Sequence, residues 1–200
     1  MAYDMVKRII DIIGSAAGLV ALAPLFAVLG LLVKLDSPGP VCHRRRILQR
    51  GGNETDAYKF RTMIPHDEGF WQKHPDLWQE YQASFKLVND PRLTRLGSVL
   101  RTTSLDELPQ LLNVLKGEMS LVGPRMISPQ ELGKYGPLAH KLLSVKPGMT
   151  GLWQVSGRQH VSYEDRVALD MAYIDRRSLA LDLKILLRTV LIVIRRKGAY

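Results

Sequence analysis

The sequence predicts an α+β protein that is predominantly helical, has a small antiparallel sheet and is attached to one side of a membrane, as a monotopic membrane protein is. Three observations support this fold class. An apolar segment near the N-terminus, residues 9–33, contains a single charged residue, Asp11. Two segments rich in strand-forming residues flank Gly51-Gly52-Asn53. Helical patterns occupy most of the remaining chain.

As a helix, the apolar segment is long enough to cross a bilayer core of about 30 Å, so a spanning helix is the default interpretation. Pro24, however, removes a backbone hydrogen bond near its middle and should bend it. Basic residues also flank both ends, which the positive-inside rule places on the cytoplasmic face: Lys7, Arg8, Lys34, Arg44, Arg45 and Arg46. We therefore predict a re-entrant helix-break-helix over residues 1–36. A cleaved signal peptide fits less well, because the apolar run is too long and no small-x-small site follows it.

Residues 37–200 are enough for one compact domain with its own core, which we expect on the cytoplasmic face. Its predicted sheet is a hairpin of residues 41–48 and 57–63, with residues 152–155 as a further candidate strand. Residues 65–86 predict a loop and then a helix. The aromatic residues of this helix should share one face and lie in the core: Trp71, Trp78, Tyr81 and Phe85. Further helices are predicted at residues 108–116, 128–144 and 163–176.

The apolar residues 179–194 are interrupted by Asp182, Lys184 and Arg188, which excludes a membrane-crossing helix. Two interpretations stay open. An amphipathic helix could lie in the membrane interface with its basic side chains near the headgroups. Alternatively, the helix packs against the core of the domain.

The chain carries 28 basic and 19 acidic residues, a formal net charge of +9. This charge suits an anionic membrane surface, a pyrophosphate substrate or a nucleic acid, and does not choose among them. The lone Cys42 excludes an internal disulfide. No pair among the five histidines has the spacing of a zinc motif, so we expect no zinc site.

The adjacent acids Asp106 and Glu107 are the strongest chemical signal. One carboxylate could bind a hard cation while the other attacks an electrophile. A structural alternative is a capping box, in which Ser104 and Glu107 satisfy each other's backbone donors. Pro109 argues against it, because its missing N–H would break a backbone hydrogen bond of that helix; the other expectation is a helix that begins near Pro109. In either case, the helix dipole and Arg101 should keep Asp106 ionised.

The segment Ser104-Leu105-Asp106-Glu107-Leu108-Pro109-Gln110 closely resembles the bacterial sugar transferase family, the monotopic phosphoglycosyl transferases. Further blocks agree in family order: residues 37–41, 58–63, 90–94, 113–125, 147–158 and 182–185. The resemblance covers nearly the whole chain. Some positions depart from the family pattern, among them Arg45 in place of a Gln, Gln49 in place of a Gly and Met126 in place of a Pro. The arginines of residues 44–46 could be a solvated or lipid-facing strip.

The resemblance implies an enzyme of the bacterial inner membrane, with its catalytic domain on the cytoplasmic face. Such an enzyme moves a sugar 1-phosphate from a UDP-sugar to polyprenyl (undecaprenyl) phosphate and releases UMP, the first membrane step of polysaccharide or glycoconjugate synthesis. By motif, Asp106 is the nucleophile that forms a phosphosugar-aspartyl intermediate, and Glu107, with Asp106, holds Mg²⁺. Anionic membrane lipids are expected partners and nucleic acids are not. A homodimer is a further expectation that no motif decides.

Cationic residues within the matching blocks are the predicted phosphate ligands, because guanidinium and ammonium groups suit phosphate oxygens: Lys59, Arg61, Arg101 and Arg125. Arg92, Arg95 and Arg158 are second choices for binding the nucleotide sugar. A surface ion pair is the alternative for each of these residues. Two alternatives to the whole assignment are a membrane-anchored glycosyl transferase that moves the sugar alone and a non-catalytic basic module that binds lipid or nucleic acid.

Overall fold

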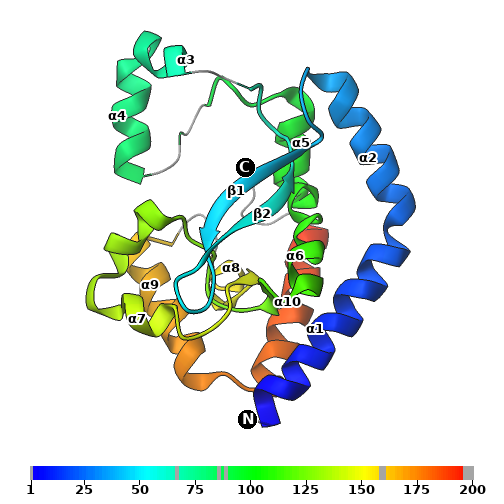
Figure 1. The fold of residues 1–200 in the computed structure, drawn as a ribbon, viewed down its shortest axis with the longest axis vertical. Helices are drawn as coiled ribbons and strands as arrows, with labels where there is room; N and C mark the ends of the chain where they lie inside the picture. The colour runs from blue at the N-terminus through cyan, green and yellow to red at the C-terminus, as the bar shows by residue number, and fades with distance from the viewer. Residues whose placement is uncertain (1, 66–67, 85–86, 88–89, 158–160, 196–200) are drawn as a thin grey trace.

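The computed structural model describes residues 2–65, 68–84, 87, 90–157 and 161–195 (Figure 1). The described chain is predominantly helical and contains a small antiparallel sheet, so the predicted secondary-structure class is confirmed. The α-helices are α1 (Ala2–Ala21), α2 (Ala23–Asp36), α3 (Glu68–Lys73), α4 (Pro75–Ser84), α5 (Arg95–Thr103), α6 (Gln110–Lys116), α7 (Ala139–Leu142), α8 (Leu152–Val155), α9 (Tyr163–Arg176) and α10 (Leu179–Arg195). The 3₁₀-helices are η1 (Leu105–Glu107) and η2 (Pro129–Leu138), and the strands are β1 (Cys42–Leu48), β2 (Glu54–Phe60), β3 (Ser120–Val122) and β4 (Gly148–Thr150).

β1 and β2 form the predicted antiparallel hairpin, in a register that pairs Cys42 with Phe60 and Leu48 with Glu54. The sequence did not predict the short parallel pair of β3 and β4. The predicted strand at residues 152–155 is wrong, because this segment is helix α8 and its Trp153 is buried. Four apolar residues are too few to distinguish the period of a strand from that of a helix.

Helix α9 begins and ends where the sequence predicts, with Ser162 as its N-cap, accepting a 3.0 Å hydrogen bond from the Asp165 N–H. The α-helix predicted at residues 128–144 is wrong in kind. This segment forms the 3₁₀-helix η2, which is kinked at Gly136 (φ 49°), and then the short α7. Pro137 directly follows that glycine and cannot supply a helical N–H.

Residues 65–86 contain the short helices α3 and α4. The rings of Trp71, Trp78 and Tyr81 contact one another as predicted, and Phe85 lies outside the described residues. These three aromatics do not enter the buried core, since Trp78 is 38% exposed. Trp71 and Tyr81 lie instead against the guanidinium of Arg92, whose carbon is 4.5 and 5.9 Å from their ring centroids.

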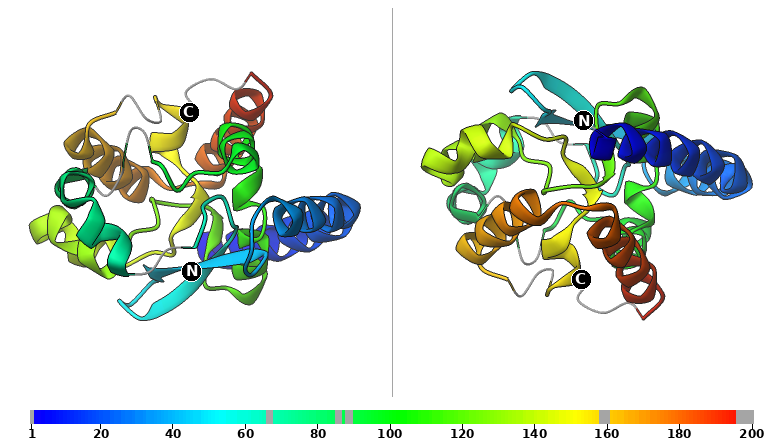
Figure 2. Two further views of the ribbon diagram at one scale, coloured as in Figure 1. Left: turned by 90° about the horizontal axis from the view of Figure 1, so that it is seen from above. Right: turned by 90° about the horizontal axis from the view of Figure 1, so that it is seen from below.

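α1 and α2 form a bent rod along one side of the molecule (Figures 1 and 2). The two helices meet at an angle of 64°, and Pro24 lies in the first turn of α2. In the described residues no single helix is long and apolar enough to cross a membrane, whereas the bent pair together meets that criterion. One face of the rod exposes large apolar side chains: Ile9, Ile10, Ile12, Ile13, Val20, Val28, Leu31, Leu32 and Leu35. An exposed apolar face of this extent is unusual for a soluble monomer and is typical of a surface that contacts a membrane or another protein.

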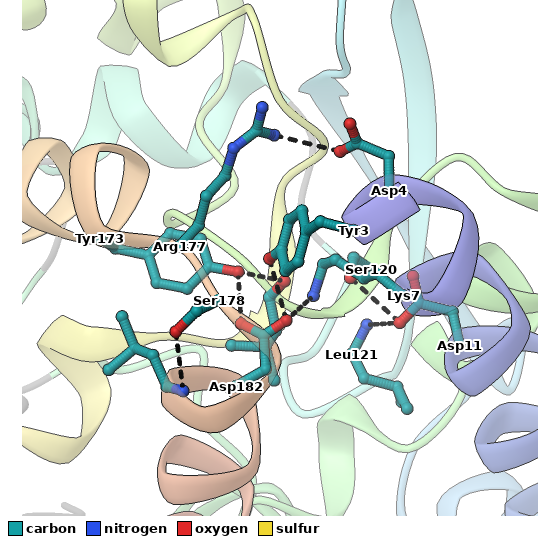
Figure 3. A network of polar contacts seen from close by, with 12 residues as sticks. Tyr3, Asp4, Lys7, Asp11, Ser120, Leu121, Tyr173, Arg177, Ser178 and Asp182 are labelled. Atoms are coloured by element: carbon teal, nitrogen blue, oxygen red, sulfur yellow. Dashed lines mark hydrogen bonds and ion pairs between the residues drawn. The ribbon is translucent and has the colours of Figure 1, made fainter. Parts of the chain in front are cut away.

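The other face of α1 packs against the rest of the chain. At Gly14, a Cβ would lie 2.8 Å from a Leu121 side-chain carbon, and at Gly18, 3.2 Å from one of Leu111. Hydrogen bonds to two buried carboxylates also join this face of α1 to the rest of the chain (Figure 3). Asp11 accepts hydrogen bonds from Ser120 Oγ (3.0 Å) and the Leu121 N–H (2.9 Å).

Asp182 of α10 is the second carboxylate of this network. It accepts hydrogen bonds from Tyr3 (3.0 Å), Lys7 (2.7 Å) and Tyr173 (2.8 Å), and so joins α1 to α9 and α10 (Figure 3). The contacts with Tyr3 and Lys7 join residues 179 and 175 positions apart in the sequence. The network therefore fixes the position of α1 on the domain.

Helix α10 packs against the core of the domain, as the second interpretation of its sequence predicts, and the position in a membrane interface stays a prediction. Ile185 is buried with Val122 and Tyr173 in one of the core clusters. The opposite side of the helix exposes an apolar stripe: Leu179, Leu183, Leu187, Val190 and Leu191. A helix with one side on the core and an exposed apolar side suits the surface of a membrane.

Candidate active site

The two acids lie in a tight turn between helices. Helix α5 ends at Thr103, and Ser104 adopts the left-handed conformation (φ 59°) that reverses the chain. η1 then makes one turn over Leu105–Glu107 before α6 begins after Pro109. The capping-box alternative is wrong, because Ser104 forms no side-chain cap. A helix start near Pro109 is confirmed.

Asp106 is buried, with 7% of its surface exposed. Burial raises its pKa from 3.8 to about 6, and the charge of Glu107 adds to the rise, while Lys59 and Arg101 oppose it. The expectation that the helix dipole and Arg101 hold this acid ionised therefore needs correction. Desolvation outweighs the charge of Arg101, so Asp106 is ionised at neutral pH by a small margin.

Glu107 has the opposite electrostatic balance. Burial raises its pKa, but a 2.5 Å ion pair with Lys59 of β2 and the charges of Arg125 and Arg45 outweigh this and keep the pKa below its usual value. Glu107 is therefore a permanent anion at neutral pH. Lys59 is bound to Glu107 and not to Asp106. The two adjacent carboxyl groups therefore have pKa values shifted in opposite directions.

Two of the predicted phosphate ligands lie within electrostatic range of the dyad. Arg101 lowers the pKa of Asp106, and its Nε donates a 3.0 Å hydrogen bond to Thr62 Oγ1. Arg125 lowers the pKa of Glu107. Its backbone is held by a bridge to Gly148 and by the buried carboxylate of Asp170, which accepts the Arg125 N–H at 3.1 Å. Together with Lys59, these residues give the dyad a cationic border.

Arg61 occupies a different place. Its guanidinium donates hydrogen bonds to the backbone carbonyls of Val33, Ser37 and Pro40, where α2 ends and the chain turns into β1. The side chain is 7% exposed. These contacts assign Arg61 to fixing the end of α2, and we leave it out of the phosphate-binding set.

The three arginines predicted as second choices for binding the nucleotide sugar lie in different parts of the chain. Arg92 is buried, pairs with Asp90 at 2.7 Å and lies against the aromatic rings of α3 and α4. Arg95 is exposed in the first turn of α5. Arg158 lies outside the described residues. The contacts of Arg92 therefore indicate a structural role, whereas nucleotide-sugar binding by Arg95 stays a prediction.

Sequence reasoning missed a cluster of polar residues beside Arg125. Arg125 and Arg166 flank the same indole, with guanidinium carbons 4.9 and 4.7 Å from the Trp153 ring centroid. Buried polar atoms without a partner gather here: Arg125 Nε, Arg166 Nε, Trp153 Nε1, Gln154 Oε1, Tyr163 Oη and Glu131 Oε2. Buried polar atoms normally have partners, so this cluster is suited to a polar ligand.

Arg45 connects that cluster to the dyad. It pairs with Glu131 at 2.7 Å and also lowers the pKa of Glu107. The interpretation of residues 44–46 as a solvated strip holds for the exposed Arg44 and Arg46 and is wrong for Arg45. Its departure from the family pattern was the one sequence signal for this contact.

Comparison with known proteins identifies the family. The model of the family described as "Bacterial sugar transferase" matches residues 2–196. The chain belongs to this family. It is 44% identical to the exopolysaccharide production protein ExoY of Rhizobium meliloti, over 98% of this chain and 88% of that protein.

Two further bacterial sugar transferases extend the comparison. The chain is 44% identical to the undecaprenyl-phosphate galactose phosphotransferase of Salmonella typhimurium, over 97% of this chain and 41% of that protein. It is 38% identical to the UDP-glucose:undecaprenyl-phosphate glucose-1-phosphate transferase of Caulobacter vibrioides, over the whole chain and 74% of that protein. The chain thus spans most of ExoY and less than half of the Salmonella relative. As a bacterial sugar transferase, it is an enzyme.

Proposed function

We propose that this enzyme transfers a sugar 1-phosphate from a UDP-sugar to polyprenyl phosphate, as the first membrane step of exopolysaccharide or glycoconjugate synthesis. The dyad carries the proposal: a buried carboxylate poised near neutrality lies beside a permanently charged one, within a cationic border. The activities for which the Salmonella and Caulobacter relatives are named support it.

In the first step, an Asp106 carboxylate oxygen attacks the phosphorus that bears the sugar. A bond forms between this oxygen and phosphorus, the bond from phosphorus to the bridging oxygen breaks, and UMP leaves with that oxygen. Burial makes Asp106 a stronger nucleophile than an exposed carboxylate, because its charge is poorly solvated. Arg101 and Arg125 would hold the diphosphate oxygens.

In the second step, a phosphate oxygen of the polyprenyl carrier attacks the same phosphorus. The acyl phosphate bond breaks, polyprenyl-diphosphate-sugar leaves and the Asp106 carboxylate is restored. No net proton transfer is needed at Asp106 in either step.

The donor set fits the Mg²⁺ that the family resemblance implies. Asp106 and Glu107 supply two carboxylates, and within the described residues no group of three or more His, Cys, Asp or Glu side chains forms a closed metal site. Mg²⁺ is commonly held by one or two carboxylates together with substrate phosphates and water. When bound, it would neutralise charge on the transferring phosphate.

The apolar face of α1 and α2 supports a re-entrant attachment to the cytoplasmic face of the bacterial inner membrane. A bend of 64° at the break is compatible with a broken span or a re-entrant pair, and the basic residues at both ends favour the re-entrant pair. The exposed stripe of α10 would lie in the interface of the same membrane.

Product analysis with the variant Asp106→Asn tests the proposal. The wild-type enzyme should release UMP and form a diphosphate-linked lipid, and the variant should lose at least about 10³-fold in turnover because the amide is not a nucleophile. Asp175→Asn, at an exposed aspartate of α9, is the matched control and should keep full activity. Release of UDP would instead indicate transfer of the sugar alone, and an active Asp106→Asn would refute the assigned nucleophile.

A further inference from the structure

A cavity of about 110 Å³ lies away from the dyad, where the N-terminal turns of α1 meet β3, the loop before β4 and the end of α9. Five basic residues line it: Lys7, Arg8, Arg50, Lys146 and Arg177. Two acidic residues, Asp4 and Asp11, are also in its walls. The volume is enough for several water molecules or one small polar group.

The acidic groups around this cavity are already engaged. Asp4 pairs with Arg177 at 3.2 Å, and Asp11 accepts the hydrogen bonds of Ser120 and Leu121 (Figure 3). Lys7 is bound to Asp182. These contacts remove Lys7 and Arg177 from the set of cations that could bind something else.

Three cations remain without a carboxylate. Arg8 donates to the carbonyls of Val114 (2.6 Å) and Leu115 (2.8 Å) at the end of α6, which leaves its charge uncompensated. In the described part of the chain, neither Arg50 nor Lys146 forms an ion pair. The fold brings these residues together, since the Gly51 N–H donates to the Leu143 carbonyl at 2.9 Å.

These cations repel one another at close range. A Cβ at Gly117 would lie 3.2 Å from an Arg8 nitrogen and 3.4 Å from Lys146 Nζ, so both charged groups face the same point. Burial lowers the pKa of Lys146 and the charge of Arg8 lowers it further, Asp11 opposes this, and Arg50 adds a smaller lowering. Like charges held this close lower stability unless an anion joins them.

We propose that this cavity binds a phosphate group, either free in solution or in the headgroup of an anionic phospholipid, between Arg8, Arg50 and Lys146. Guanidinium and ammonium donors match phosphate oxygens, and Arg50 is exposed, so the cavity is accessible. The exposed apolar face of α1 starts at Ile9, directly after Arg8. A phosphate here would also join α1 to the end of α6, the helix that follows the dyad. The inference is independent of the chemistry proposed for Asp106.

Thermal unfolding of the full chain in a neutral detergent tests the proposal. Tm is measured against inorganic phosphate and against short-chain phosphatidylglycerol, with sodium chloride and short-chain phosphatidylcholine as reference additions. The double variant Arg50→Gln/Lys146→Gln removes two cavity cations, and Lys73→Gln, at an exposed lysine of α3, is the matched control.

We expect a saturable rise in Tm for the wild type and Lys73→Gln, with an apparent affinity about tenfold or more weaker in the double variant. Without an anion, the double variant should be at least as stable as the wild type, because repulsion is relieved; this separates loss of binding from loss of folding. A response to both anions supports a general phosphate site, and a response to phosphatidylglycerol alone supports a lipid headgroup. The catalytic arginines also attract phosphate, so an equal response of the double variant and the control would overturn the proposal. So would the absence of any saturable response.

Discussion

Asp106 and Glu107 are neighbours in the sequence, yet their surroundings move their pKa values in opposite directions. Desolvation dominates at Asp106, whereas the ion pair with Lys59 dominates at Glu107. The dyad itself was predicted from the sequence, because adjacent acids in a recognisable motif are a local signal. Its environment was not, since Lys59 comes from β2 and Arg45 from β1, and no local pattern reports contacts across such separations.

The raised pKa of Asp106 predicts the pH dependence of the reaction. The nucleophile must be ionised, so kcat/KM at a Mg²⁺ concentration well below saturation should fall as pH decreases through about 6, the pKa of Asp106 in the metal-free enzyme. A pH series of initial rates at low donor concentration measures it. A rate that stays constant down to pH 4.5 would show that Asp106 is not the group that must ionise.

The same pKa predicts that the nucleophile lowers stability. The folded protein holds the Asp106 proton more tightly than the unfolded chain does, so stability falls as pH rises from about 4 to about 6. Above that range the buried charge costs on the order of 2–3 kcal/mol. Asp106→Asn should therefore have a higher Tm than the wild type at pH 7.5 in EDTA, and an equal Tm near pH 4. A lower Tm at pH 7.5 would contradict this assignment.

At the level of elements, local signals predicted α9 and the hairpin, whereas α5, despite its Thr94 N-cap, and the short or irregular segments were not predicted. Ser162 marks the start of α9, and the glycines between β1 and β2 mark the hairpin. The parallel pair of β3 and β4 has three residues in each strand, which is below the length at which a period can be recognised. η2 looks helical in sequence, but Gly136 and Pro137 interrupt it.

Helix α5, which leads into the dyad, is placed by close backbone contact with the end of β2. A Cβ at Gly97 would lie 2.0 Å from the Thr62 carbonyl oxygen. Gly97→Ala should therefore lower the free energy of unfolding by about 1–3 kcal/mol or more and displace the dyad, which reduces turnover. Urea unfolding and a rate assay measure these effects. Gly133→Ala, where a Cβ meets nothing within 4 Å, is the control; equal effects of the two substitutions would refute the packing argument.

At the level of the whole molecule, the rod of α1 and α2 and the rest of the described chain are one packed unit. Hydrogen bonds of Asp11 and Asp182 join α1 to β3, α9 and α10 (Figure 3). The sequence predicted the bend at Pro24 and the apolar face. It gave no sign of this attachment, because both carboxylates pair with residues distant in the chain.

Removing Asp11 should loosen this attachment. Asp11→Ala leaves Ser120 and the Leu121 N–H without their acceptor, and we expect a loss of about 1–3 kcal/mol in the free energy of unfolding. Limited proteolysis in detergent should then cleave the variant faster near α1. Asp4→Ala, which breaks an exposed ion pair, should cost about 1 kcal/mol or less. Equal rates of proteolysis near α1 in the two variants would show that Asp11 does not attach this helix to the domain.

The central claim is that Asp106 becomes covalently phosphorylated during turnover, and intact-mass measurement tests it most directly. The purified full chain is incubated with Mg²⁺ and a panel of UDP-sugars in the absence of lipid acceptor. The account predicts a mass gain of one phosphosugar, located on Asp106 and lost when polyprenyl phosphate is added. An adduct on another side chain, or product formed with no enzyme-linked species, would contradict it.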